Sequence, residues 1–428
     1  MSKIMMMMVF TLLTSNSMYF SMAMMSSIMI MIMIFYNNIL DLQTLNSMFM
    51  IDSLSLTLIL LSSITSILII MSTNMFSFSK KMIIMISLIL MITFSTSKTI
   101  IFYIFFEIVL IPTMILITKS GAQPERLKAS MYLIMYTILA SLPLLIIILL
   151  CKSCDDFLNA PITMKKIEIP LLFMMAFLAK TPMFIIHIWL PKAHVEAPLE
   201  GSMVLAAVLL KLGGYGMIRF IPLSLFSLKL IPHWILAIST MGAVFSSSGC
   251  LRQKDLKALI AYSSVAHMAI TLSSIMIFSK TSINGAIIMM IAHGLSSSAL
   301  FFLVNLTYTK FHTRNMISLK SMFSSNPNTT FWWLMFCMAN ISAPPSLNLI
   351  GELLMSMALI KWNMILSVFI IIITLLTTSF CVIMFLMLNH GSSMLKISNN
   401  DSMKFYMSLF IHLFILIMII LKMEFMLV

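Results

Sequence analysis

The chain has 428 residues, of which 61% are hydrophobic and 9% are charged, and its mean hydropathy is +1.08. This composition excludes a soluble globular protein, because too few polar residues remain to cover an apolar core. The 26 Lys and Arg residues outnumber the 13 Asp and Glu residues. They are scattered singly and in pairs between apolar runs, which is typical of loops at lipid headgroups and excludes the clustered basic face of a nucleic-acid-binding protein.

Long apolar runs recur along the whole chain and predict an all-α membrane protein. A helix needs about 20 apolar residues to cross about 30 Å of hydrocarbon. By this criterion we expect about fourteen transmembrane helices in one transmembrane domain, residues 1–428, with short connections and no cleaved N-terminal signal. In chain order, the expected helices are Ile4–Leu13, Met18–Tyr36, Ser53–Met71, Met82–Thr96, Thr99–Thr118, Ala129–Leu150, Leu171–Leu190, Leu199–Ile221, Pro232–Cys250, Leu256–Phe278, Ile283–Leu306, Phe331–Lys361, Leu366–Leu388 and Phe405–Leu421.

Two of the expected helices contain proline in mid-membrane. Pro182 lacks the N–H that would bond the carbonyl of Leu178, and Pro344 and Pro345 interrupt a second helix in the same way. The breaks are 162 positions apart, which corresponds to about five helices with their loops. A five-helix repeat must be inverted relative to its copy, and paired broken helices in inverted repeats indicate an ion pathway. The alternative is two ordinary kinked helices.

Three charged residues, Glu107, Lys180 and Lys211, lie inside expected helices rather than at their ends. A charge at the bilayer centre costs about 2.5–3.5 kcal/mol, so a partner on a neighbouring helix is expected to offset it. Lys180 is the natural partner of Glu107, because it stands two residues before Pro182, where freed carbonyls and water can accompany it. A buried lysine readily gives up its proton, and a nearby carboxylate restores the charged form. These residues therefore favour proton movement over the alternative, a purely structural ion pair.

Glu352 and His293 extend this set of candidate proton-carrying residues. Glu352 lies inside an expected helix beyond the second proline break, and His293 is in mid-helix beside serines that can hold water. His187 and His267 are secondary relay candidates, for which helix packing or interfacial anchoring is the competing interpretation, as it is for His194. The sequence shows no phosphate-binding loop, metal-ligand cluster, haem-ligand pair or nucleophile constellation, so we expect no cofactor, metal or redox centre in this chain.

Several long segments carry a family resemblance. They include LPKAHVEAP at 190–198 and GSMVLAAVLLKLGGYG at 201–216. The other matching segments are 105–112, 123–127, 255–264, 291–295 and 343–352. Over about residues 94–354 the chain resembles the chain 4 family of mitochondrial NADH–ubiquinone oxidoreductase, one of three antiporter-like families in the membrane arm of respiratory complex I.

The resemblance implies a fold of fourteen helices with two inverted five-helix repeats, each holding a broken helix. The first repeat would span about residues 82–221 and the second about 232–388, with peripheral helices at both ends. It also implies a subunit that translocates protons across the mitochondrial inner membrane. NADH, flavin, iron–sulfur clusters and ubiquinone would act elsewhere in the complex, and the partners would be other membrane-arm subunits and the lipid bilayer. The alternatives are an autonomous cation/proton antiporter and a structural scaffold.

The resemblance also assigns roles to individual residues. Glu107 and Lys180 would be the carboxylate–lysine pair of the first repeat, and Lys211 and His293 would continue a central polar axis. Glu352 would end this axis at the second broken helix. The sister subunits usually have lysine at that last position, so glutamate favours chain 4.

Glu200 and Lys128 depart from the family's pattern. Glu200 stands where the family usually has a small or apolar residue, and together with Glu196 it adds acidity at the start of an expected helix. Lys128 replaces a commonly neutral residue. Neither departure lies on the inferred axis.

Overall fold

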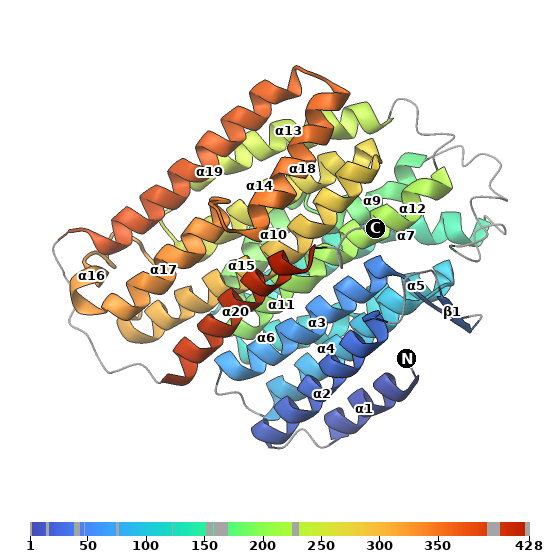
Figure 1. The fold of residues 1–428 in the computed structure, drawn as a ribbon, viewed down its shortest axis with the longest axis horizontal. Helices are drawn as coiled ribbons and strands as arrows, with labels where there is room; N and C mark the ends of the chain where they lie inside the picture. Colours follow the sequence, from blue (N-terminus) through green and yellow to red (C-terminus); the bar gives the residue numbers. More distant parts are fainter. Residues whose placement is uncertain are drawn as a thin grey trace.

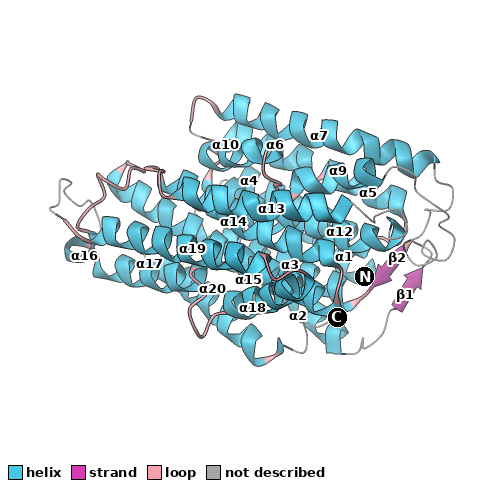
Figure 2. Cartoon of the chain, turned by 90° about the horizontal axis from the view of Figure 1, so that it is seen from above, coloured by secondary structure: helices cyan, strands magenta, loops and turns pink. Residues whose placement is uncertain are grey.

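The computed structural model describes residues 2–13, 17–37, 43–46, 48–73, 77–121, 123–150, 157, 170–224, 231–391 and 403–423. Within these ranges the chain is almost entirely helical, and the long helices run side by side in a common direction (Figure 1). After a quarter turn they form one elongated bundle, with a short β-hairpin at the end where the N-terminus lies (Figure 2). Nine of the described helices are long and apolar enough to cross a membrane, as the composition predicted.

Up to residue 150, the described residues form seven helices and the hairpin. They are α1 (Ser2–Leu13), α2 (Met18–Asn37), β1 (Gln43–Asn46), β2 (Phe49–Ile51), α3 (Ser53–Ser72), α4 (Ser77–Ser95), α5 (Thr99–Ile108), α6 (Leu110–Ser120) and α7 (Arg126–Leu150). The hairpin was not predicted, because its short strands lie between strongly apolar runs that dominate the pattern. The expected helix Thr99–Thr118 is two helices that meet at Val109, since Pro112 cannot donate to the carbonyl of Ile108.

The middle part of the chain holds the first proline break. Its elements are α9 (Pro170–Lys180), a 3-10 turn (Ile186–Ile188), α10 (Trp189–Glu196), α11 (Leu199–Val204), a π-helical segment (Leu205–Leu209) and α12 (Leu210–Ser224). Past the break, the N–H of Met183 donates to the carbonyl of Leu178 at 3.1 Å. The carbonyl of Leu178, to which Pro182 cannot donate, therefore accepts a hydrogen bond from the next residue, Met183.

The last part of the chain repeats this kind of break. Its elements are α13 (Ile231–Cys250), α14 (Leu256–Ile277), α15 (Lys280–Phe311), α16 (Met322–Ser325), α17 (Pro327–Asn340), α18 (Leu347–Trp362), α19 (Leu366–Asn389) and α20 (Met403–Leu421). The expected helix Phe331–Lys361 is thus interrupted between α17 and α18. There the N–H of Ala343 donates to the carbonyl of Met338 at 3.0 Å, again across five residues.

Burial distinguishes central helices from peripheral ones. The apolar stretch of α15 is buried throughout, and the continuous run from α11 to α12 is almost completely buried. By contrast, less than a third of each apolar stretch in α7, α19 and α20 is buried. Polar side chains in the middle of α12 and α15, such as Lys211 and His293, are therefore shielded by protein.

Glycine permits a close backbone contact beside the first break. A Cβ atom on Gly213 of α12 would lie 2.7 Å from both the backbone nitrogen and a side-chain carbon of Thr181, so backbone would have to shift. At Gly249, near the end of α13, an added Cβ would meet nothing within 4 Å.

We expect Gly213→Ala to destabilise the protein by about 1–3 kcal/mol, because overpacking forces α12 away from the broken helix. The thermal unfolding midpoint of the purified protein in detergent measures this change, and Gly249→Ala is the matched control. Equal midpoints for the two variants would contradict the close packing of α12 on Thr181.

Candidate functional site

The carboxylate of Glu107 and the amine of Lys180 face each other between α5 and α9. Glu107 lies just before the interruption at Val109, and Lys180 is the last residue of α9, at the proline break. The Nζ atom of Lys180 lies 4.0 Å from Oε1 of Glu107, and the lysine side chain is 4% exposed. Neither carboxylate oxygen of Glu107 has a hydrogen-bond partner in the described part of the chain. The predicted pair is therefore present, in a stretched geometry.

Lys211 and His293 form a closer pair at the centre of the bundle. Lys211 lies on α12, directly after the π-helical segment, and is completely buried. Its Nζ atom donates to the carbonyl of Ala206 within that segment at 2.6 Å. The same atom lies 3.2 Å from Nδ1 of His293 on α15. A proton can pass directly between these two side chains.

His267 connects this central pair to Glu352. The ring of His267 on α14 has its centroid 5.7 Å from that of His293. Its Nδ1 atom lies 3.4 Å from Oε1 of Glu352 on α18. Four helices thus bring Lys211, His293, His267 and Glu352 into one row, in which neither ring nitrogen of His267 has a hydrogen-bond partner among the described residues. Sequence reasoning had ranked His267 behind His293, because spacing along α14 does not show which neighbour the ring faces.

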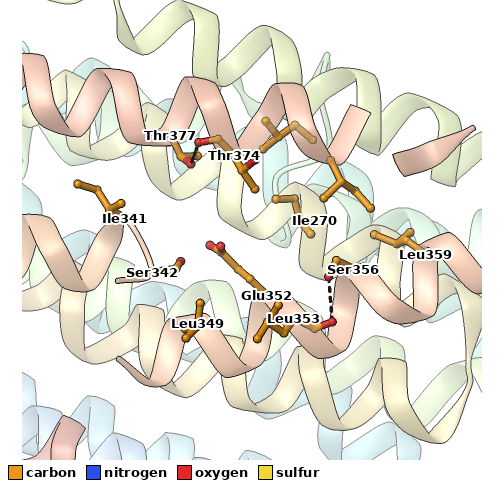
Figure 3. A pocket seen from close by; sticks show the side chains of 12 residues that line it. Ile270, Ile341, Ser342, Leu349, Glu352, Leu353, Ser356, Leu359, Thr374 and Thr377 are labelled. Carbon is orange, nitrogen blue, oxygen red and sulfur yellow. Dashed lines mark hydrogen bonds between the residues drawn. The ribbon is translucent and has the colours of Figure 1, made fainter. Parts of the chain in front are cut away.

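The row ends at a cavity of ≈ 220 Å³ between α14, α18 and α19. Glu352 points into this cavity, which has mostly apolar walls and a few hydroxyl groups, among them those of Ser342, Thr374 and Thr377 (Figure 3). The carboxylate therefore contacts His267 on one side and a cavity large enough for water on the other.

No hydrogen bond joins the first pair to the central pair in the described part of the chain. A cavity of ≈ 10 Å³ lies beside Lys180, and its walls include Leu205 and Leu209 of the π-helical segment. Such a volume is close to the minimum that holds one water molecule. In the described part of the chain, Lys211 and His293 lie within hydrogen-bond distance of each other. Neither ring nitrogen of His267 has a hydrogen-bond partner there. The step from His293 to His267, like the step from Lys180 to Lys211, therefore requires a water molecule or a side-chain movement.

His187 and His194 take up different positions from the row. His187 stacks on Phe184, with ring centroids 5.0 Å apart. His194 is buried and stacks on Phe301 at 4.9 Å, with both ring nitrogens unpaired among the described residues. The structure does not bring His187 into contact with the row, and for His194 it favours packing over interfacial anchoring.

Glu200 lines a second cavity, of ≈ 390 Å³, at one end of the bundle. Glu196, Lys257 and Arg314 line the same cavity, and Nζ of Lys257 donates to the carbonyl of Ala197 at 2.7 Å. The unusual Glu200 therefore sits among opposite charges rather than alone in an apolar environment.

Comparison with known proteins decides between the families that could carry such a row of residues. Residues 96–378 match the family described as NADH:quinone oxidoreductase/Mrp antiporter, TM. NADH-ubiquinone oxidoreductase chain 4 of Rhipicephalus sanguineus is 41% identical over 384 residues, covering 88% of each chain. The same chain of Myxine glutinosa is 44% identical over 77% of this chain and 74% of its own length. The chain belongs to the NADH-ubiquinone oxidoreductase chain 4 family.

Solved structures show the fold of this chain 4 family member. A chain in respiratory complex I from Thermus thermophilus with bound NADH superimposes with a TM-score of 0.88, at 20% identity, covering 97% of this chain and 94% of that one. A chain of the Mrp complex from Dietzia sp. gives a TM-score of 0.82, at 14% identity, covering 94% of this chain and 80% of that one. The predicted resemblance is confirmed, and the antiporter-like fold with it.

Proposed function

We propose that this chain 4 family member translocates protons in the membrane arm of respiratory NADH:ubiquinone oxidoreductase, in the mitochondrial inner membrane. The observation that carries the proposal is the row from Lys211 to Glu352, four ionisable side chains close together inside an apolar bundle. Ionisable residues at this depth are costly and are typical of proton pathways. Electron transfer would take place on other subunits, with NADH, flavin, iron–sulfur clusters and ubiquinone.

The proposed architecture has fourteen membrane spans, with inverted repeats at about residues 82–221 and 232–388. The two breaks support it, because each contains proline and each is bridged by an N–H that donates across five residues. Nine helices of the described residues are long and apolar enough to cross a membrane. The proposal reaches fourteen by adding α1, α2 and α13, and by counting α9–α10 and α17–α18 as one broken span each. The first broken helix carries Lys180 and the second carries Glu352, so each broken helix holds one end of the proposed pathway.

In the proposed mechanism, a signal from a neighbouring subunit changes the distance between Glu107 and Lys180. Lys180 then releases its proton towards Lys211. The proton passes from Nζ of Lys211 to His293, on to His267, and from Nδ1 of His267 to the carboxylate of Glu352. Each histidine accepts a proton on one ring nitrogen and releases one from the other. The membrane potential opposes this movement with about 2.3 kcal/mol per charge per 100 mV, and a neighbouring subunit must supply that energy.

Purification tests the assignment directly. We expect the affinity-tagged chain to be isolated from mitochondrial membranes together with NADH:ubiquinone reductase activity, and to generate a pH gradient in liposomes only as part of that assembly. The likeness to a chain of an Mrp complex favours one other candidate, an autonomous cation/proton antiporter. Sodium-dependent proton flux by the isolated chain in liposomes would support that candidate instead.

A further inference from the structure

The ammonium group of Lys180 lies closer to Phe106 than to Glu107. Its Nζ atom donates to the carbonyl of Phe106 at 2.7 Å and lies 3.0 Å from the centre of the Phe106 ring. The nearest carboxylate oxygen of Glu107 is 4.0 Å away. One residue thus offers the lysine both a hydrogen-bond acceptor and an aromatic face, directly beside the carboxylate assigned as its partner.

Neighbouring aromatic rings hold the Phe106 ring in place. Phe102, one turn earlier on α5, has its ring centroid 5.5 Å away, and Phe177 on α9 packs edge-on at 5.7 Å. All three side chains are completely buried. The ring therefore presents a fixed face to the lysine, and the absence of bulk water strengthens the attraction between a cation and an aromatic face.

We infer that Phe106 is a positioning residue that holds charged Lys180 in a released state, separated from Glu107. This inference rests on the proposed function, because the released lysine is the form that passes its proton towards Lys211. The ring and the carboxylate compete for the same ammonium group. Once Lys180 has lost its proton, the ring no longer attracts it. When Lys180 is protonated again, the attraction between the ring and the ammonium group returns.

The competing explanation is that Phe106 only fills space in the aromatic cluster. Substitutions at Phe106 that remove the aromatic face without a large change in side-chain size distinguish the two explanations. Phe106→Leu and Phe106→Met keep an apolar side chain of similar size but remove the aromatic face. Phe106→Tyr keeps the face. Phe102→Leu is the matched control, because it makes the same change in the same buried cluster without touching Lys180.

The readout is the rate of proton translocation coupled to NADH oxidation by the purified complex in liposomes. We expect Phe106→Leu and Phe106→Met to lower this rate about tenfold, and Phe106→Tyr and Phe102→Leu to stay within about twofold of the unsubstituted complex. Unchanged rates in the Leu and Met variants would overturn the inference. A Phe106→Tyr rate as low as that of Phe106→Leu would overturn it too, as would failure of both the Leu and Met variants to assemble.

Lys180→Met, measured in parallel, separates this inference from the proposed function. Unchanged pumping in Lys180→Met would remove the lysine from the mechanism and contradict the proposed pathway itself. A loss of pumping in Lys180→Met together with full activity in Phe106→Leu would overturn the role of Phe106 alone.

Discussion

Complex I carrying Lys180→Met should lose proton translocation and coupled NADH oxidation by at least about tenfold. Methionine keeps the length and apolar stem of lysine but removes the charge and the three donors. The hydrogen bond to Phe106 and the attraction to Glu107 are lost together. No proton can then leave this position towards Lys211. Turnover and the pH gradient formed by purified complex in liposomes measure both effects.

Lys128→Met is the matched control for this experiment. Lys128 makes an ion pair with Glu125 at 4.0 Å, the same distance, but both side chains are largely exposed. Exposed pairs of this kind contribute little, so this variant should pump normally. Full pumping by Lys180→Met would exclude the lysine from the pathway. Full pumping by a Glu107→Lys, Lys180→Glu exchange would instead indicate that the pair only holds helices together.

The sequence was sufficient to predict the features that depend on local chemistry. Apolar length located the long helices, and the missing N–H groups of Pro182, Pro344 and Pro345 located two breaks, whereas the interruption before Pro112 was not predicted. Charge inside an apolar run identified Glu107 and Lys180, which the structure places 4.0 Å apart. These predictions succeeded because bilayer thickness and proline geometry act on each segment independently.

The contacts between helices could not be predicted in the same way. The rotation of α14 decides that His267 faces both His293 and Glu352, and one sequence contains no measure of that rotation. The π-helical segment before Lys211 changes only the hydrogen-bond register, so its composition resembles that of any apolar helix. The close contact of Lys180 with Phe106 was not predicted, because in the sequence a phenylalanine next to a glutamate looks the same as any residue of the hydrophobic core.

His267→Leu should block the pathway beyond the central pair. Leucine fills similar space but can neither accept nor release a proton, so Lys211 and His293 lose their connection to Glu352. We expect proton translocation and coupled turnover to fall at least about tenfold, while the complex still assembles. The same liposome assay measures the loss, and the amount of assembled complex on native gels shows that the fold is retained.

His412→Leu is the control that makes this result specific. His412 on α20 is also completely buried, but its Nδ1 atom bonds the carbonyl of Ser408 in its own helix at 2.7 Å. Removing it deletes a buried imidazole of the same size outside the row, so pumping should persist. If His267→Leu pumps as well as His412→Leu, protons must reach Glu352 without passing through His267, and water in the ≈ 220 Å³ cavity beside that carboxylate becomes the route to test.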